Sequence, residues 1–580
     1  MLLLYIYFLI IRLSSFILHT CASVVKKALF RLEALILIMS NTEKKYILAI
    51  DHGTSGPKPA IVSVYGEVID WVLKEVPLHL PEPGAAEQDP QDWWRGIVEG
   101  SKELIAKRKV DPNDIIAVCN TSQWSGTVPI DENGKELMNC IIWMDTRGAE
   151  QMRKLHKGLI QVSGYNLFKI LKWVKITGGG PTLSGKDSIA HVLWIKENHP
   201  EIYERTYKFL EPQDWVNFKL SGQIASSEAT IQMHWMTDIR DINNIKYSKK
   251  LIKKLKLDPN KFPEIIKTTD VVGTVTKEFA QTVGLSSDVK VIAGAPDLHT
   301  ATIGSGAVED YKTHFCIGTS DWLLCQFPFK KVDIFHNMGT APSGIPGKYM
   351  LLNEQEIAGG ALSFLRDNIL YHKDELLKEE QVPDVYKIFD KIVEATPPGA
   401  HNLIFTPWLF GERAPIDDHT VRGGIYNISL DTTREHLIRA IFEGVAYNIK
   451  WLLIYVEKFI EKWVQKNQPE LIKDEKIIPE LNIIGGGAKS DVWCQIFADV
   501  LDRKVKQVKN PIQANARGAA FIASVGLGYV KWEDIPKYTE IAQVFEPNPA
   551  NRELYDNLFE EFLRIYKVMG KTYKNLNKLH

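Results

Sequence analysis

The 580-residue sequence has few cysteines and no excess of charge of either sign. None of its six cysteines forms a Cys-x-x-Cys pair, which excludes a disulfide-rich scaffold and the common zinc motifs and favours a reduced, cytoplasmic protein. The formal net charge is −1. Because no polybasic arm is present either, we expect no nucleic-acid partner. The six are Cys21, Cys119, Cys140, Cys316, Cys325 and Cys494.

Long uninterrupted hydrophobic runs are also missing. The apolar run at residues 1–11 ends at Arg12, well short of the about 20 residues that a membrane span needs. No basic region precedes it, so the signal-peptide pattern is incomplete. We expect residues 1–43 to be an N-terminal extension outside the fold, with Met39 as the working start and no membrane association. The alternative is a membrane anchor within residues 1–38.

The length of the chain exceeds what one hydrophobic core usually serves, so we expect two large domains. Hydrophobic residues make up 45% and charged residues 24%, which places both domains in the ordinary globular class. Strand and helix signals alternate along the chain, which indicates an α/β fold. We assign an N-terminal domain to residues 44–304 and a C-terminal domain to residues 305–575.

A strand, a glycine–threonine turn and a second strand occur twice. Residues 46–50 are apolar β-formers that end in the sequence Asp-His-Gly-Thr at 51–54, and another strand-like run follows at 60–64. The same arrangement recurs at residues 314–320 and 322–325. The repeat predicts two related domains, each of which offers one glycine turn to a shared cleft.

Both turns are suited to binding phosphate. Gly53 and Gly318 let the backbone approach an oxyanion closely. Thr54 and Thr319 add hydroxyl and N–H donors beside these glycines. Asp51 ends the first strand, where its carboxylate can hold Mg²⁺ through water molecules. The alternative for the first turn is an ordinary hairpin.

Asp297 follows a further apolar strand, predicted at residues 289–293. The residues between them are small and leave room for a ligand. A carboxylate at this position can accept the proton of a sugar hydroxyl. The alternative is an aspartate that caps the next helix.

Three consecutive glycines stand at a predicted strand-to-helix junction. The strand covers residues 481–484, the glycines are 485–487, and an apolar helix follows. Such a junction lets a nucleotide lie against the backbone and the helix N-terminus. The dinucleotide pattern G-x-G-x-x-G is broken by Ser490, which makes a dinucleotide site less favoured.

Residues 180–186 match most of a P-loop, but two features oppose that function. Asp187 stands where magnesium chemistry requires Ser or Thr, and Pro181 removes one N–H donor from the phosphate cradle. We therefore interpret this segment as a loop near the substrate and not as a Walker motif.

Three helical predictions complete the outline. Residues 189–196 read as a buried helix, and the lysine-rich stretch 242–267 as a solvated helical surface. A long helix is predicted from Thr433, with Thr432 and Glu435 forming its capping box.

Taken together and in order, these residues resemble the FGGY carbohydrate kinase family over about residues 46–528. Each piece alone is weakly specific, whereas their joint order is highly specific. The matching pieces are 51–54 with Lys58, 87–90 with Trp93 and Trp94, 143–147, 294–304, 318–320, 411–415 with 422–423, 486–491 and 517–520.

The resemblance implies two ribonuclease H-like domains of the actin/hexokinase type on either side of a catalytic cleft, which closes over ATP, Mg²⁺ and a small sugar. By the same resemblance Asp297 is the general base, and Asp51 places the metal. The phosphates and the nucleotide are assigned to Gly53, Thr54, Lys58, Gly318, Thr319, Ser320, Gly486, Gly487, Ala488 and Ser490. The sugar is assigned to Gln88, Gln123, Trp124, Asp145 and Arg147. Members of the family are often dimers, so a homodimer is a further expectation.

Several residues depart from the family pattern, mainly on the sugar side. Leu298 stands where Gln or Asn often follows the catalytic aspartate, and residues 123–126 read Gln-Trp-Ser-Gly where xylulose kinases typically carry Gln-Met-His-Gly. Trp124 either stacks on a sugar, narrows the pocket or packs in the core. Asn427 replaces a glycine, a mild change because Asn tolerates left-handed backbone. The resemblance favours a ketopentose such as xylulose; the alternative is a non-catalytic sugar or nucleotide sensor on the same fold.

Overall fold

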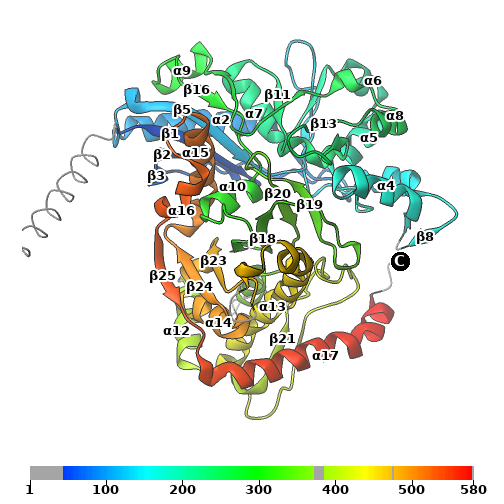
Figure 1. The fold of residues 1–580 in the computed structure, drawn as a ribbon, viewed down its shortest axis with the longest axis vertical. Coiled ribbons are helices and arrows are strands. Elements are labelled where there is room, and N and C mark those ends of the chain that lie inside the picture. Colours follow the sequence, from blue (N-terminus) through cyan, green and yellow to red (C-terminus); the bar gives the residue numbers. More distant parts are fainter. Residues whose placement is uncertain (1–43, 163, 371–383, 473–475, 578–580) are drawn as a thin grey trace, which may run out of the picture. The chain divides into compact units, whose positions relative to one another are not determined.

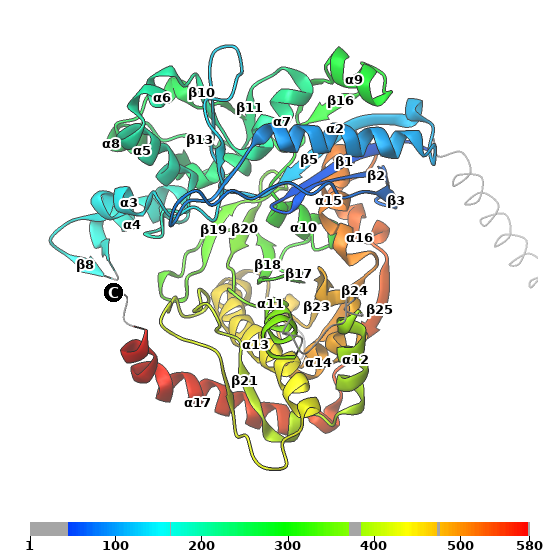
Figure 2. The same ribbon diagram turned by 180° about the vertical axis from the view of Figure 1, so that it is seen from behind.

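The computed structural model describes residues 44–162, 164–370, 384–472 and 476–577. Two mixed β-sheets form the framework of this part of the chain (Figures 1 and 2). No helix in these ranges is long and apolar enough to cross a membrane. The N-terminal extension predicted at 1–43, with its working start, lies outside the described residues.

The first sheet has six strands in the order β15-β16-β5-β1-β2-β3. Strand β1 is antiparallel to β2 and parallel to β5, and β5 is parallel to β16. Because helices cover both faces of the central strands, residues 47–50 of β1 are apolar and fully buried. The strands are β15 (Val271–Thr274), β16 (Lys290–Ile292), β5 (Ile115–Ser122), β1 (Tyr46–Gly53), β2 (Gly56–Ser63) and β3 (Val68–Trp71).

The second sheet has seven strands in the order β19-β20-β18-β17-β23-β24-β25. Strand β17 is antiparallel to β18 and parallel to β23, which is parallel to β24. The strands are β19 (Gly339–Pro342), β20 (Tyr349–Leu352), β18 (Asp321–Phe327), β17 (Thr313–Ile317), β23 (Glu480–Ile484), β24 (Lys504–Val508) and β25 (Ile541–Phe545).

The two sheets repeat one plan. In each, a hairpin (β1–β2 or β17–β18) continues into an antiparallel third strand on one side and into two parallel strands on the other. The duplicated strand-turn-strand predicted from the sequence is therefore confirmed. Parallel strands end at the same edge of a sheet. The turn after β1 therefore lies beside the loop after β5, and the turn after β17 lies beside the loop after β23.

Helices surround both sheets, and several short strand pairs lie outside them. The helices are α2 (Pro90–Ala106), α3 (Ala149–His156), α4 (Leu167–Thr177), α5 (Ser188–Asn198), α6 (Pro200–Arg205), α7 (Pro212–Ser221), α8 (Lys249–Leu255), α9 (Lys277–Val283), α10 (Asp297–Gly304), α11 (Gly360–Phe364), α12 (Val385–Ala395), α13 (Arg434–Asn467), α14 (Asp491–Leu501), α15 (Ala514–Gly526), α16 (Ile535–Tyr538) and α17 (Arg552–Leu576). The short strands are β4 (Glu87–Gln88), β6 (Val128–Ile130), β7 (Cys140–Ile141), β8 (Gln161–Val162), β9 (Tyr165–Asn166), β10 (Lys208–Leu210), β11 (Ala225–Ser227), β12 (Thr237–Asp238), β13 (Lys246–Tyr247), β14 (Glu264–Ile266), β21 (Ile404–Thr406) and β22 (Gly424–Tyr426). The buried helix predicted at 189–196 is confirmed as α5.

Helix α15, late in the chain, packs against β1, β5 and α10 of the first half (Figures 1 and 2). A Cβ atom added at Gly304 would lie 1.8 Å from the carbonyl oxygen of Ala514, and one added at Gly518 would lie 1.9 Å from that of Thr300. Only glycine permits so close an approach of two helix backbones. The predicted domain boundary at 304/305 stays a prediction, because this helix joins the second half to the first sheet.

The long helix predicted from Thr433 is α13, but the predicted capping box is wrong. The N-cap is Thr433, whose hydroxyl accepts the N–H of His436 at 3.5 Å, while the Thr433 N–H donates to the imidazole of His436 at 3.2 Å. Thr432 takes part in the preceding turn instead, and Glu435 is not the reciprocal partner. Two neighbouring threonines made the helix start ambiguous by one residue.

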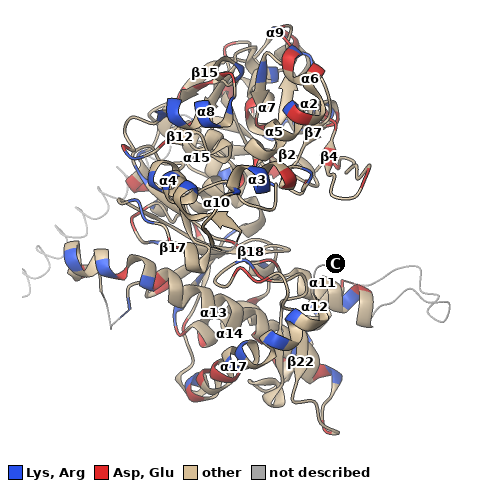
Figure 3. Ribbon diagram, turned by 90° about the vertical axis from the view of Figure 1, so that its right-hand side faces the viewer, with Lys and Arg blue, Asp and Glu red and all other residues tan. Residues whose placement is uncertain are grey.

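The solvated helix predicted at 242–267 is wrong for most of that stretch. Only α8 is α-helical there, and β13 and β14 occupy other parts. The apolar side chains of α8 are buried, whereas its basic residues give the helix a charged outer face (Figure 3). The buried residues are Leu251, Ile252 and Leu255. The lysine residues of the sequence indicated the exposed face of this helix but not its buried apolar face.

Candidate functional site

The first glycine–threonine turn joins β1 to β2 at an edge of the first sheet. Residues 54–55 form its tip, between the paired Gly53 and Gly56. Gly56 has φ +131°, and a Cβ atom there would lie 2.0 Å from the carbonyl oxygen of Lys74. Gly56 is therefore packed against the segment after β3, whereas residues 53–55 are half-buried or exposed.

Asp51 and Lys58 lie opposite each other below this turn. They are register partners on β1 and β2, and the Lys58 Nζ atom is 3.2 Å from Asp51 Oδ2. Only 6% of Asp51 is exposed, so its carboxylate lies at the base of the turn and not on the outer surface. The structure thus places two predicted site residues side by side.

The second glycine turn, residues 318–320, joins β17 to β18 in the same way. The Gly318 N–H donates to the carbonyl of Ser320 at 3.0 Å and closes the turn. Its other carbonyls accept from the start of α11: Gly359 N–H donates to Gly318 at 2.9 Å, and Gly360 N–H donates to Thr319 at 3.0 Å. The turn is held from behind while Thr319 itself is exposed.

The triple-glycine segment lies next to this second turn. Strand β23 runs parallel to β17 with Ile484 opposite Cys316, so residues 485–487 leave the sheet where β17 ends. Gly487 packs on β17, because a Cβ atom there would lie 2.3 Å from the Ile317 side chain. Gly486 is exposed, and a Cβ atom there would meet nothing within 4 Å. An open strip of backbone therefore follows the strand.

Ser490 and Ala488 complete the predicted nucleotide segment. The Ser490 hydroxyl caps α14 by accepting the N–H of Trp493 at 3.2 Å, and donates to Asp390 Oδ1 at 2.6 Å. Ala488 is fully buried, and its carbonyl accepts from Gln507 at 2.8 Å. Their nucleotide contacts stay predictions, since both residues already serve to position the loop.

Asp297 is the first residue of α10, directly after β16 of the first sheet. Its Oδ1 atom accepts the backbone N–H of Leu298 at 2.8 Å. Burial raises the pKa of Asp297 to about 7, and the charges of Asp51 and Glu354 add to this rise, while the Leu298 N–H and the Lys58 ammonium oppose it. An acid with a pKa near neutrality is suited to general-base work.

Glu354 raises the pKa of Asp297 through its charge and also contacts the second glycine turn. It follows β20 of the second sheet, and its Oε1 atom accepts the hydroxyl of Ser320 at 3.3 Å. Cys316, at the end of β17, has a pKa raised by burial and further by the charges of Asp297 and Asp51. Groups from both sheets therefore lie within one another's electrostatic field, which supports the predicted convergence of the two turns.

A further charged residue, which like Glu354 is not among the predicted site residues, lies beside Glu354. Arg413 forms ion pairs with both Glu354 and Glu356, one contact to Glu356 being 3.1 Å. Burial lowers the pKa of Lys186, with Arg413 contributing, and the two glutamates oppose this. The signals were present in the sequence, since Arg413 lies in the 411–415 family motif.

Lys186 lies at the end of the P-loop-like segment, which is confirmed as a loop and not a Walker motif. The segment follows helix α4 and leads into α5, whereas a P-loop follows a strand. Asp187 accepts the N–H of Thr182 at 2.5 Å and its hydroxyl at 2.9 Å, which closes the loop on itself.

Gln88 and Gln123, predicted to bind sugar, form a hydrogen-bonded chain behind the first turn. The Gln123 amide donates to Gln88 at 2.8 Å, and the Gln88 amide donates to the carbonyl of Thr54 at 2.8 Å. The Thr54 hydroxyl donates to Gln123 at 3.2 Å and accepts from the Trp143 indole at 3.0 Å. Both glutamines position the turn here, and their direct contact with sugar stays a prediction.

Asp145 and Arg147 form a second internal network. Asp145 is fully buried and accepts the Arg147 Nε–H at 2.8 Å, while Arg147 Nη2 lies 2.6 Å from Glu87. The guanidinium also lies over the Trp194 ring, 4.2 Å from its centroid. This pair fastens β4 to α5 and the loop before α3, and its predicted sugar contact is likewise untested.

Trp124 contacts the helix that begins with the candidate base, Asp297. Only 7% of it is exposed, and its indole N–H donates to the carbonyl of Thr230 at 2.8 Å. Its ring meets His299 edge-on, with centroids 5.0 Å apart, and His299 lies two residues after Asp297 on α10. This placement agrees with the predicted packing in the core, whereas the other two alternatives, stacking on a sugar and narrowing of the pocket, stay predictions.

The carboxylate of Asp51 fits a magnesium ion held mainly through water and phosphate. In the described ranges, no group of three or more His, Cys, Asp or Glu side chains is arranged to hold a metal ion. Mg²⁺ usually keeps several waters and takes one or two carboxylates together with substrate phosphates. The donor set thus suits a magnesium ion that arrives with a nucleotide.

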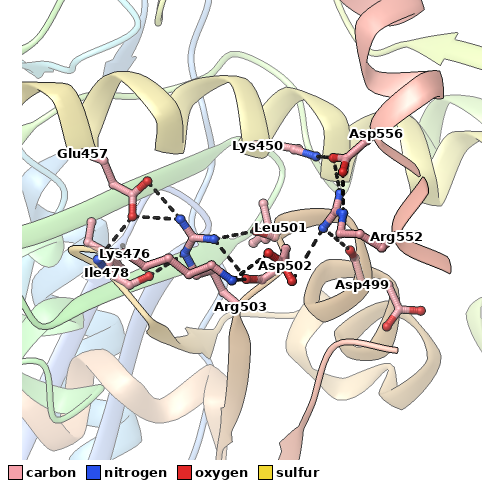
Figure 4. Close-up of polar contacts among 10 residues, drawn as sticks. All are labelled: Lys450, Glu457, Lys476, Ile478, Asp499, Leu501, Asp502, Arg503, Arg552 and Asp556. Carbon is pink, nitrogen blue, oxygen red and sulfur yellow. Dashed lines mark hydrogen bonds and ion pairs between the residues drawn. The ribbon is translucent and has the colours of Figure 1, made fainter. Parts of the chain in front are cut away.

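A cavity of about 160 Å³ lies among α13, α14 and α17 (Figure 4). Its charged side chains pair with each other: Arg503 Nη2 lies 2.9 Å from Glu457, and Lys450 Nζ lies 2.7 Å from Asp556, which also pairs with Arg552. None of the predicted site residues lines it. We therefore assign the pairs of Asp556 to the packing of α17, and the Arg503–Glu457 pair to the packing of α13 against the segment after α14.

Sequence comparison matches most of the chain to one family. Residues 46–304 match the N-terminal domain of the FGGY family of carbohydrate kinases, and residues 314–527 match its C-terminal domain. A xylulose kinase of Staphylococcus epidermidis is 29% identical over 536 residues, which cover 90% of this chain and 97% of that protein. A xylulose kinase of Bacillus subtilis is 28% identical over 546 residues, covering 92% and 100%.

Solved structures confirm the predicted fold class. A ligand-bound xylulose kinase of Lactobacillus acidophilus superimposes with a TM-score of 0.77 at 24% identity and covers 92% of this chain and 100% of its own. A Plasmodium falciparum glycerol kinase with ADP gives a TM-score of 0.74 at 20% identity, covering 90% and 99%. The architecture is the two-domain α/β fold of the actin/hexokinase type. The chain therefore belongs to the FGGY family of carbohydrate kinases, which are phosphotransferases with an alcohol group as acceptor.

Proposed function

We propose that the protein transfers the γ-phosphoryl group of ATP to a hydroxyl of a ketopentose such as xylulose. Relatives named xylulose kinase align with this chain over nearly their whole length, at 29% and 28% identity. A gluconokinase of Bacillus licheniformis and a glycerol kinase of Thermococcus gammatolerans align at 23% and 25%. The higher identities favour the ketopentose among these acceptors.

The observation that carries the proposal is the environment of Asp297. This carboxyl group lies at the start of α10. Its pKa is about 7 because of burial, and the charges of Asp51, on β1 of the first sheet, and of Glu354, just after β20 of the second, add to this rise. A general base needs a pKa near the working pH and a position near the nucleophile. Kinases otherwise need little covalent help from the protein beyond positioning and charge stabilisation.

In the proposed reaction, the Asp297 carboxylate accepts the proton of the sugar hydroxyl. The hydroxyl oxygen forms a bond to the γ-phosphorus, the bond from that phosphorus to the β,γ-bridging oxygen breaks, and ADP leaves with the electron pair. Residues 53–54 and 318–320 hold the phosphates from two sides, with Lys58 adding a positive charge. Asp51 would hold the magnesium ion, which neutralises phosphate charge when bound.

The nucleoside is assigned to residues 486–488 and Ser490. The exposed strip at Gly486 gives the base and ribose a flat backbone surface next to the second phosphate turn. We further propose a cytoplasmic location, since the five cysteines in the described part of the chain are unpaired and buried. A homodimer and the absence of a nucleic-acid partner also remain proposals.

A substrate panel tests this function. Purified protein is incubated with ATP–Mg²⁺ and with xylulose, ribulose, gluconate or glycerol, and both ADP release and the sugar phosphate are measured. We expect the highest kcat/KM with a ketopentose and a fall in kcat of about 10²- to 10⁴-fold in Asp297→Asn. Tight sugar binding without phosphorylated product from the wild-type protein would instead establish the sensor alternative that Leu298 raises.

A further inference from the structure

A buried carboxyl group, Glu211, lies directly behind the Trp-Ser-Gly segment at residues 124–126. Glu211 is 1% exposed and immediately precedes α7. Its Oε2 atom accepts the N–H of Gly126 at 3.0 Å, and its Oε1 atom accepts the hydroxyl of Ser188 at the start of α5. One carboxyl group thus connects three segments that are far apart in the sequence.

The segment that Glu211 holds contains a strained residue. Ser125 has φ +64°, in the left-handed region that is unfavourable for a non-glycine residue. Its hydroxyl donates to the carbonyl of Lys186 at 2.9 Å, and its N–H also points toward Glu211. Such strain persists only where the surroundings over-determine the backbone, and it concentrates at ligand-binding positions.

The same segment is pressed against the helix that carries this carboxyl group. A Cβ atom added at Gly126 would lie 2.5 Å from Cγ of Pro212, the first residue of α7. Helix α7 packs on β5, a central strand of the first sheet. Glu211 is therefore delivered from a rigid element, which is how precise binding geometry is usually supported.

On its other side the segment contacts α10, the helix that begins with the candidate base. The Trp124 indole is fixed by the carbonyl of Thr230 and meets His299 on α10, the helix that begins with Asp297. Any relaxation of residues 124–126 would move the Trp124 ring against that helix. Residues 124–126 are thus held between Glu211 on one side and α10 on the other.

We propose that Glu211 is a positioning residue for the acceptor sugar, because its carboxyl group fixes Ser125 and Gly126 in the strained conformation that sets the place of Trp124. The inference rests on the proposed function, in which Asp297 accepts the proton of the sugar hydroxyl, and on the predicted sugar contact of Trp124. Glu211 itself does not touch the sugar and acts through the backbone of this segment.

The chemistry of Glu211 predicts which substitution will preserve its role. Burial raises the pKa of Glu211 well above its usual range, and the nearby charge of Asp214 adds to this. Its neighbour His234 lies 3.4 Å from Oε1, and burial lowers the pKa of that histidine to about 3, so the imidazole is uncharged at neutral pH. A glutamine side chain keeps one oxygen that accepts the Gly126 N–H, and its amide N–H can donate to the Ser188 hydroxyl, which accepts as well as donates.

The test compares Glu211→Ala and Glu211→Gln with a matched control, Asp214→Asn. Asp214 lies three residues after Glu211, on α7, is equally buried, and has a pKa of about 8 because of burial, with the Ser226 side chain and the Glu211 backbone opposing this rise. Steady-state kinetics gives separate KM values for the sugar and for ATP, and thermal unfolding reports folding. A misplaced binding segment typically costs up to about 100-fold, so we expect Glu211→Ala to raise the sugar KM by roughly 10- to 100-fold.

The expected pattern has three further parts. The ATP KM of Glu211→Ala stays near the wild-type value, Glu211→Gln restores the sugar KM, and Asp214→Asn leaves both KM values unchanged. A merely structural carboxyl group would move both KM values together or neither. A folded Glu211→Ala protein with the wild-type sugar KM would overturn the inference, as would a glutamine variant as impaired as the alanine variant.

A second variant keeps the test decisive if Glu211→Ala does not fold. Ser188→Ala removes only one partner of the carboxyl group, and we expect it to raise the sugar KM by several-fold without affecting the ATP KM. An unchanged sugar KM in this variant would count against the inference. Failure of the proposed function is a distinct result, because the wild-type protein would then phosphorylate no sugar of the panel.

Discussion

Replacing Asp297 by Asn removes the carboxylate that we assign as the general base while keeping its size. General-base catalysis contributes typically 10²- to 10⁴-fold, so kcat should fall by about that factor, equal to about 3–5 kcal/mol of barrier. The asparagine side chain can still accept the N–H of Leu298, which is 2.8 Å from Oδ1. ATP binding should therefore be retained, and calorimetry with the nucleotide measures this.

The pH profile provides the sharper part of the same experiment. Because the pKa of Asp297 is raised to about 7, its active ionised form is lost as pH falls below that value. The kcat/KM of the wild-type protein should decline about tenfold per pH unit below about 7, whereas residual activity of Asp297→Asn should lack this limb. Stopped coupled assays across the pH range, with the coupling enzymes in excess, measure both profiles.

The same shift has a consequence for stability, with a definite sign. A carboxyl group whose pKa is higher in the folded state favours folding when protonated, and this contribution is lost as pH rises from about 4 to about 7. The shift from 3.8 to about 7 sets an upper limit of about 4 kcal/mol, which the partial exposure of Asp297 reduces. Asp297→Asn should thus unfold at the same or a higher temperature at pH 8.

Two results would refute this reasoning. One is an Asp297→Asn protein with wild-type kcat, since the reaction would then not need this carboxylate. The other is a wild-type kcat/KM that is flat from pH 5 to pH 8, because the environment of Asp297 requires a change in its charge within that interval.

The remaining predictions use other parts of the site and fold. Lys58→Met should move the acid limb of the kcat/KM profile to higher pH, because the Lys58 ammonium lowers the pKa of Asp297. Glu354→Gln should move the limb to lower pH, because the Glu354 carboxylate raises that pKa. Shifts of the two variants in the same direction would contradict the assignment. Gly486→Ala should keep the wild-type melting temperature, since the new Cβ meets nothing within 4 Å, but weaken ATP binding measured by calorimetry; unchanged binding would remove Gly486 from the nucleotide site. Thr433→Ala should destabilise the protein by about 1 kcal/mol in urea unfolding through loss of the α13 cap, whereas the alanine variant of the neighbouring threonine should cost less.

The architecture was largely predictable because its signals are local and repeated. Apolar runs that end in glycine turns mark the hairpins at 46–63 and 313–327, and both occur where the structure has them. Asn427 was expected to tolerate a left-handed backbone in place of glycine, and its φ is +69°. The packing of α15 on the first sheet was not predictable, because no local pattern reveals a contact between residues that are hundreds of positions apart.

The candidate site was predictable where chemistry determines residue type and less so where packing does. Asp51, Lys58 and Asp297 share one electrostatic environment, as the family resemblance implied. In contrast, Gln88 was assigned to sugar by resemblance, and its amide is used to hold the first turn. Glu211 carries no sequence signal, because a buried carboxyl group is recognised only by the atoms around it.

A structure of the protein with a non-hydrolysable ATP analogue, Mg²⁺ and a ketopentose tests the central claim most directly. We predict a single triphosphate held by both residues 53–54 and residues 318–320, with the acceptor hydroxyl about 2.6–3.2 Å from the carboxylate of Asp297. A triphosphate that contacts only one of these turns, or a sugar whose hydroxyls all lie beyond reach of Asp297, would contradict the account.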